Sequence, residues 1–261
     1  SFICLSFFLP FKPFKINFKK GKNLWQLMLL GIIQPVLYFV CEQYGIVYTN
    51  TAISGVFCAL IPVMVMYFSA VFLKEKPTLM QIISGFISLI GVTVISIIGS
   101  SEGQIKWYGI LFLIGAIVTS GFFNILSRKL RADFSPMERT FAMFLIGAAV
   151  FTSIAAIKFK GNFLNQMLTP LLDKDFVFSI LYLSVLSSVA GFLLYNVATS
   201  NVTVVLSSSF SNVGTVVTLL AGVFILKETL TPLQIICCVI ILIGVFGVNL
   251  SKRINFKKTN H

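Results

Sequence analysis

The sequence predicts an all-α integral membrane fold in which two repeats of five helices, ten in all, cross the membrane in opposite orientations. Three observations predict it. Hydrophobic residues make up 57% of the 261 residues and charged residues only 11%. Apolar segments of about 20 residues, the length that spans a bilayer, recur along the chain. One stretch also occurs twice. A soluble domain of this length would carry more surface charge, so we expect a multi-pass membrane protein.

The stretch that occurs twice runs from Leu73 to Ile95 and again, 153 residues later, from Leu226 to Val248. Twelve of its 23 positions are identical. The informative identities are scarce residue types in one register: Lys74/Lys227, Glu75/Glu228, Thr78/Thr231, Gln81/Gln234 and Gly91/Gly244. They predict an internal duplication, in which a charged Lys-Glu corner ends one helix at the membrane surface and precedes the next.

Apolar segments separated by polar or basic connections predict the individual helices. Residues 1–9 are apolar but too short to span, so we expect the chain to begin inside a helix that is only partly present. The complete spans are expected at about 24–41, 51–72, 79–98, 107–126, 139–157, 177–197, 203–225 and 232–250. The longest connection is 158–175, and its apolar part is expected to lie in the membrane interface.

The repeat offset predicts the domain organisation and the topology. We expect the first repeat over 1–99, without its first helix and part of its second, the second repeat over 107–251, and a basic cytoplasmic tail over 252–261. Five crossings per repeat make the second repeat enter from the opposite side, so the two Lys-Glu corners should face opposite compartments. With the tail inside, 15 of the 20 Lys and Arg residues lie inside. The positive-inside rule thus favours a cytoplasmic C-terminus in the cell's inner or plasma membrane.

Charge, cysteine and histidine patterns argue against several other functions. The net charge of +12 comes from short basic clusters between apolar runs, which are typical of membrane-protein loops, so we expect no nucleic-acid partner. The five cysteines lie in apolar runs without CxxC spacing and are expected to be free thiols. The only histidine is the last residue, His261. The close acid pairs, Asp133/Glu138 and Asp173/Asp175, lie in basic loops. We therefore predict no enzyme, cofactor or metal site.

Polar side chains at membrane depth indicate where a binding site would lie, because hydrocarbon offers them no partners. Glu42 is the acid closest to being embedded, at the outer end of the 24–41 span. It would bind a substrate amine or take up a proton, or else extend to the interface and reach water. Gln34 and Tyr38 lie on the same predicted helix face, where they would line a cavity or hydrogen-bond another helix.

The second half of the chain carries polar residues at matching places. Tyr195 and Asn196 occupy the repeat positions of Glu42 and Gln43. Ser208 and Asn212 lie on one serine-rich helix, where close helix packing is the alternative to ligand contact. The predicted substrate-binding residues are Gln34, Tyr38, Glu42, Asn124, Tyr195, Asn196, Ser208 and Asn212.

The two repeats resemble the EamA repeats of the drug/metabolite transporter superfamily. The resemblance rests on the Lys-Glu corner followed by Thr, Gln and a Gly-Val helix, and on Pro62 in ALIPVMVMYFSAVFLKE. Thr215, at the repeat position of Pro62, departs from the pattern. The resemblance covers nearly the whole chain, and it implies ten helices, cytoplasmic ends and a substrate cavity near the membrane midplane between the two halves.

The resemblance implies a secondary transporter that works by alternating access. We expect export of amino-acid-like or other small polar metabolites. Multidrug or organic-cation efflux, or import, is the alternative. A non-transporting scaffold would instead pack the Gln34, Tyr38 and Glu42 face without a cavity. The partners expected are a small-molecule substrate and the lipid bilayer; the oligomeric state is not predicted. Because no nucleotide-binding motif is present, a proton or substrate gradient is expected to drive transport rather than ATP.

Overall fold

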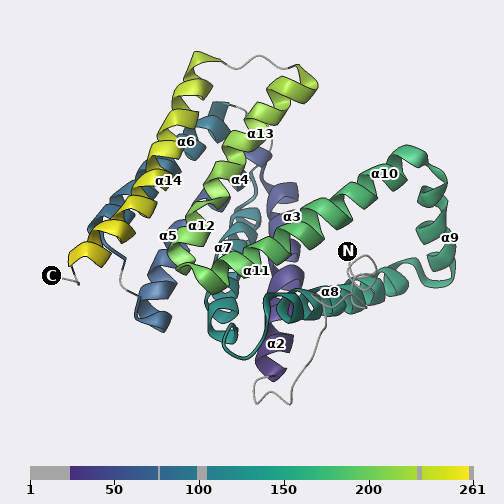
Figure 1. Ribbon diagram of the computed structural model, residues 1–261. Coiled ribbons are helices and arrows are strands. Elements are labelled where there is room, and N and C mark those ends of the chain that lie inside the picture. The colour runs from purple at the N-terminus through teal and green to yellow at the C-terminus, as the bar shows by residue number, and fades with distance from the viewer. Residues whose placement is uncertain (1–23, 76, 99–104, 228–230, 259–261) are drawn as a thin grey trace. The chain divides into compact units, whose positions relative to one another are not determined.

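The computed structural model describes residues 24–75, 77–98, 105–227 and 231–258, which form helices joined by short connections (Figure 1). Within these residues, eight helical segments are long and apolar enough to cross a membrane: 24–48, 53–73, 79–98, 107–130, 136–159, 174–201, 204–224 and 232–250. The all-α class and the eight complete spans expected from the sequence are confirmed.

The first half of the described chain contains α2 (Leu24–Gly31), η2 (Ile32–Leu37), α3 (Tyr38–Tyr48), α4 (Thr51–Ala59), α5 (Ile61–Phe68), η3 (Ser69–Leu73) and α6 (Leu79–Ile98). The second half contains α7 (Trp107–Leu130), α8 (Pro136–Phe159), η4 (Lys160–Asn162), α9 (Phe163–Leu168), η5 (Thr169–Leu172), α10 (Lys174–Tyr182), η6 (Leu183–Ala190), α11 (Gly191–Asn201), α12 (Val204–Ser209), α13 (Ser211–Leu226) and α14 (Pro232–Lys258).

These helices form two compact units. Among the described residues, unit 1 comprises 24–37 and 126–201, and unit 2 comprises those within 38–125 and 202–258. Each unit therefore takes helices from both halves of the sequence.

In unit 1, α2 and η2 pack closely on α8. A Cβ atom at Gly31 would lie 2.6 Å from Cδ1 of Ile146, and one at Gly147 would lie 2.7 Å from Cγ of Pro35. An apolar cluster of Met137, Phe144 and Val189 joins α8 to the η6–α11 segment. The small residues therefore let these helices approach to backbone distance.

Within unit 1, a fully buried arginine on α8 joins α11 to residues 126–130, the last turn of α7. The Arg139 guanidinium donates from Nη1 to the carbonyl and hydroxyl oxygens of Ser127, at 2.5 and 2.6 Å. From Nη2 it donates to the Asn196 carbonyl at 2.8 Å and to the Ser200 hydroxyl. Arg128 and Arg131 donate to carbonyls of the same last turn of α11. Three cations thus satisfy the carbonyls that end α11, where a helix dipole favours positive charge.

In unit 2, α6 and α14 run antiparallel in close contact (Figure 1). A Cβ atom at Gly91 would lie 2.7 Å from Ile241 and 3.0 Å from the Cys237 carbonyl. A Cβ atom at Gly244 would lie 2.6 Å from backbone atoms of Ser84 and Ser88. Ser84 and Ser88 stand at the repeat positions of Cys237 and Ile241, so the contact is the same when the two repeats are exchanged. This is the geometry of two equivalent helices related by an inverting two-fold axis.

The residues that identified the repeat have structural roles at this helix pair. Lys74 and Lys227 both end a helix in the left-handed conformation, with φ of 57° and 59°. Their N–H groups donate to the carbonyls of Ser69 and Gly222, which are again repeat equivalents. Thr78 with Gln81, and Thr231 with Gln234, form the same capping box at the helix that follows. Because α6 and α14 are antiparallel, the two corners lie at opposite ends of this pair; Glu228 itself lies outside the described residues.

The fourth helix, predicted over 107–126, continues to Leu130, so that Arg128 and Lys129 lie in its last turn rather than in a loop. The boundaries of three other predicted helices were also wrong. The first span was expected to end at 41, but it continues to Tyr48. The chain leaves the helix there because Asn50 caps the next helix, with its Oδ1 accepting the Ile53 N–H at 2.8 Å. The fifth begins at Pro136 rather than Arg139, because Ser135 and Glu138 form a capping box. The sixth begins at Lys174, which Asp173 caps by accepting the Asp175 N–H. In each case polar residues that resembled loop sequence serve as helix caps.

We predict that Gly244→Ala destabilises the protein by about 1–3 kcal/mol, because the added methyl meets backbone atoms that cannot move away without separating α6 and α14. Thermal unfolding of the purified protein in detergent measures this loss of stability. The matched control is Gly214→Ala, since no atom lies within 4 Å of a Cβ there. This control should leave the midpoint unchanged or raise it. Equal effects of the two variants would contradict the close crossing.

We predict that Arg139→Leu lowers the unfolding midpoint by an amount equivalent to about 1–3 kcal/mol, because buried oxygens of Ser127 and Asn196 lose their donors. Arg131→Leu is the control, since that exposed side chain makes a single hydrogen bond to the Ser200 carbonyl. It should change the midpoint little. If Arg139→Leu matched the control, the proposed role of Arg139 in holding α7, α8 and α11 together would be wrong.

Candidate functional site

Two helices of unit 2 are interrupted near the middle of their spans. The first interruption is at Leu60, between α4 and α5, where Pro62 supplies no N–H to the preceding turn. The second is at Phe210, between α12 and α13, where no proline occurs. Hydroxyls bond back to the same helix there: Ser207 to Val204, Ser208 and Ser209 to Val205, and Ser211 to Ser208. Such bonds bend helices. Interrupted membrane helices frequently flank binding sites in transporters.

A cavity of about 460 Å³ lies beside both interruptions. Its lining residues come from α3, from the α4–α5 helix, from α6 and from α13: Tyr38, Glu42, Gly55, Cys58, Ala59, Ile61, Val92, Ile95, Ser96, Ser211, Asn212, Thr215, Thr218 and Leu219. Two pairs among them, Cys58/Ser211 and Ala59/Asn212, are repeat equivalents. The cavity therefore lies within unit 2 at the place where the two sequence repeats face each other.

Glu42 is the only Asp, Glu, Lys, Arg or His among the described residues that line this cavity. One of its carboxylate oxygens, Oε1, accepts a hydrogen bond from the Tyr38 hydroxyl at 2.8 Å. The Cys58 thiol lies 3.9 Å from the same oxygen. The tyrosine and the cysteine thus orient the carboxylate, while the contacts that the structure shows leave Oε2 available to a ligand.

Asn212 of α13 also lines the cavity and is buried. Its Nδ2 donates to the Ser88 hydroxyl of α6 at 3.0 Å. That hydrogen bond links α13 to α6 and orients the amide, which leaves its carbonyl oxygen and one N–H for a ligand.

Three of the eight residues predicted from the sequence, Tyr38, Glu42 and Asn212, are brought together here. Asn124 and Ser208 are buried in unit 2, and each donates to a carbonyl of its own helix. They are absent from the lining of this cavity.

The remaining three predicted residues, Gln34, Tyr195 and Asn196, belong to unit 1. Asn196 is fully buried and donates to the Thr140 hydroxyl at 2.9 Å, while its Oδ1 accepts from Ser127. Gln34 is buried, with non-helical φ and ψ of −143° and 121°. The helix face on which it was expected to align with Tyr38 is therefore interrupted, because Gln34 precedes Pro35 and residues before proline avoid the helical conformation.

Sequence reasoning missed Cys58, Ser96 and Thr218 as lining residues. The repeat offset offered one signal, since it pairs Cys58 with Ser211 in the serine-rich helix. The thiol of Cys58 is free, as expected, and so are those of Cys41, Cys237 and Cys238; Cys4 lies outside the described residues.

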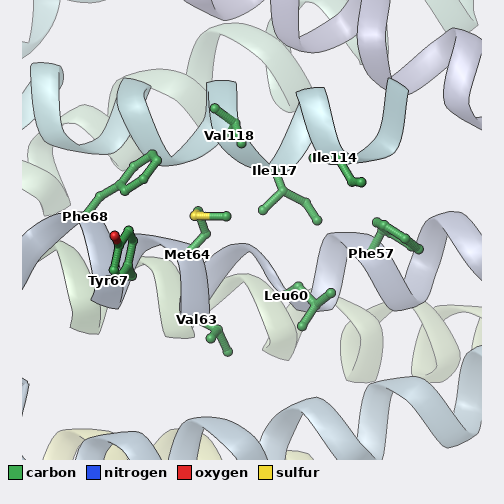
Figure 2. A pocket seen from close by; sticks show the side chains of 9 residues that line it. All are labelled: Phe57, Leu60, Val63, Met64, Tyr67, Phe68, Ile114, Ile117 and Val118. Atoms are coloured by element: carbon green, nitrogen blue, oxygen red, sulfur yellow. The ribbon is translucent and has the colours of Figure 1, made fainter. Parts of the chain in front are cut away.

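A second cavity, of about 660 Å³, lies between the α4–α5 helix and α7 (Figure 2). Figure 2 shows Leu60 and Met64 facing Ile117 and Val118 of α7 across it. The Tyr67 hydroxyl is the only side-chain oxygen or nitrogen among its described lining residues. This groove has no group to recognise a charged or strongly polar ligand, so the Glu42 cavity is the candidate substrate site.

Comparison with known proteins agrees with this architecture. The sequence pattern of the EamA-like transporter family matches residues 1–97 and 107–250. The chain is 32% identical over 234 residues to the uncharacterized transporter YcxC of Bacillus subtilis (strain 168), covering 88% of this chain and 74% of that protein. It is 26% identical to an uncharacterized transporter of Archaeoglobus fulgidus, covering 88% and 79% of the two chains.

A solved structure, titled only as the crystal structure of a protein, has a similar fold. The TM-score is 0.75 at 17% sequence identity, and the match covers 97% of this chain and 83% of that one. The family match extends over nearly all of the sequence, and the helical spans agree with it. The chain is therefore a member of the EamA-like transporter family.

Proposed function

We propose that this protein is a secondary transporter of small polar metabolites that works by alternating access, with the Glu42 cavity as its substrate site. The cavity is the observation that carries the proposal: a half-buried carboxylate lies within a membrane-spanning segment, beside interruptions in two repeat-related helices. Carboxylates at membrane depth are costly, and those that occur there usually bind a substrate or a proton. Membership of a transporter family supports a carrier rather than an enzyme.

The sequence leaves two kinds of cargo open, amino-acid-like metabolites and organic cations. An ammonium group with N–H donors on either kind would bind Glu42 through a charge-assisted hydrogen bond. The Glu42 carboxylate alone therefore does not discriminate between them, and the choice rests on the other groups that line the cavity. Export as the direction, and a cytoplasmic C-terminal tail, are proposed from the family resemblance and from the distribution of Lys and Arg.

A proton is the coupling ion that this site suits. Glu42 would hold either a proton or a cationic substrate, so a pH gradient across the membrane would drive exchange of one for the other. A transporter driven only by the substrate gradient would show no such dependence.

We predict that Glu42→Gln reduces transport of an amine substrate by about tenfold or more, because a charge-assisted hydrogen bond contributes about 1.5–3 kcal/mol. The variant should also lose the stimulation by a pH gradient. Uptake by proteoliposomes that contain the full-length protein, with and without that gradient, measures both. Asp175→Asn is the control, because Asp175 is an exposed carboxylate outside the cavity. Wild-type transport by Glu42→Gln would rule out this site.

We predict that Cys58 reacts with a water-soluble, membrane-impermeant thiol reagent when it is the only cysteine in the protein. The cavity exposes this thiol to water, whereas the thiol of Cys237, which is 2% exposed in an apolar cluster, should stay unlabelled in the matched single-cysteine variant. Labelling rates measured by mass spectrometry compare the two. A non-transporting scaffold predicts that neither cysteine reacts, and that result would contradict the proposed site.

A further inference from the structure

Resting on the proposed function, we infer that the Glu42 cavity selects organic cations that carry N–H groups, such as primary ammonium or guanidinium compounds, and rejects molecules that also carry a carboxylate. Among the residues that line the cavity, more hydrogen-bond acceptors than donors remain available to a ligand. A binding site must offer acceptors to an ammonium group and donors to a carboxylate.

Most donors in the cavity are already used within the protein. The hydroxyl of Tyr38 and the thiol of Cys58 point to the Glu42 carboxylate. The hydroxyl of Ser211 donates to the Ser208 carbonyl at 2.6 Å, and that of Thr218 donates to the Gly214 carbonyl at 2.9 Å. Each of these groups can therefore only accept a hydrogen bond from a ligand.

Asn212 uses one of its two N–H groups within the protein. Its Nδ2 donates to Ser88, which leaves its Oδ1 as an acceptor and one N–H as a donor. Its repeat counterpart, Ala59, and the counterpart of Ser88, Ile241, lie in one buried apolar cluster. The polar pair takes one residue from each repeat and is replaced by apolar residues at the repeat-equivalent positions, and it adds an acceptor to the cavity that contains Glu42.

A carboxylate would find little support here. The hydroxyls of Ser96 and Thr215 are uncommitted among the described residues, and one N–H of Asn212 remains, but all three groups are neutral. No basic side chain is among the described lining residues, and Glu42 would repel a second anion in the same cavity. Moving a carboxylate out of water without a cation or several donors is unfavourable.

A quaternary ammonium ion would also bind poorly. It has no N–H to give to the acceptors, and proteins usually hold such ions against several aromatic faces. Tyr38 is the only aromatic residue among the described residues that line the cavity. The cavity thus favours cations that donate hydrogen bonds over cations that only carry charge.

The test uses protection of Cys58 in the full-length protein with the other cysteines replaced by alanine. Labelling is measured with the impermeant reagent in the presence of two matched pairs of compounds. 1,5-Diaminopentane and lysine differ only in the α-carboxylate. Methylammonium and tetramethylammonium carry the same charge, but three methyl groups of the second replace the three N–H hydrogens of the first. We expect 1,5-diaminopentane and methylammonium to slow labelling about tenfold or more, and lysine and tetramethylammonium less than about twofold, as loss of a charge-assisted hydrogen bond implies.

Glu42→Gln should remove the protection, and Asp175→Asn should keep it. Protection by lysine equal to that by 1,5-diaminopentane would overturn the exclusion of carboxylates. Protection by tetramethylammonium equal to that by methylammonium would overturn the requirement for N–H groups, and labelling that no compound slows would overturn the inference as a whole. In all three cases the cavity could still serve a different cargo, whereas complete absence of Cys58 labelling would mean that the proposed function itself fails.

Discussion

The hydrocarbon of a membrane offers no hydrogen-bond partners, and this constraint explains most of what the structure shows. Polar groups in the spans must be satisfied inside the protein. The Arg139 guanidinium meets this requirement for the end of α11, and the serine hydroxyls of α12 meet it by bonding their own helix. The same constraint shapes the cavity, where most donors are used internally. What remains for a ligand is the Glu42 carboxylate, a set of acceptor oxygens and a few neutral donors on Ser96, Thr215 and Asn212.

In the duplicated sequence, the residues that pack and cap the helices are the same in both repeats, whereas the residues that line the cavity differ. The positions that stayed identical in the two repeats, such as Gly91/Gly244 and Gln81/Gln234, serve the close crossing of α6 and α14 and the capping of helices. Positions around the cavity have diverged: Glu42 corresponds to Tyr195, and Asn212 to Ala59. A symmetric scaffold can support inverted motion of its two halves, while a ligand that is not itself symmetric needs different groups on each side.

Much of this could be predicted from the sequence. Span lengths follow from bilayer thickness, and the antiparallel packing of α6 and α14 agrees with the odd number of crossings inferred for each repeat. Glu42 stood out because an acid is rare at membrane depth. The rest depended on tertiary contacts. Asn196 looked like a ligand-binding amide but bonds Ser127 and Thr140, and nothing in its local sequence distinguishes the two roles. The interruption at Phe210 has neither proline nor glycine to mark it.

The central claim is that a cationic substrate binds the Glu42 carboxylate. An experimental structure of the full-length protein with 1,5-diaminopentane bound tests it most directly. The account predicts density for the diamine in the cavity between α3 and α13, with one nitrogen within about 3 Å of a Glu42 carboxylate oxygen. Density for the diamine at another place, or a cavity filled by side chains in the bound state, would contradict it.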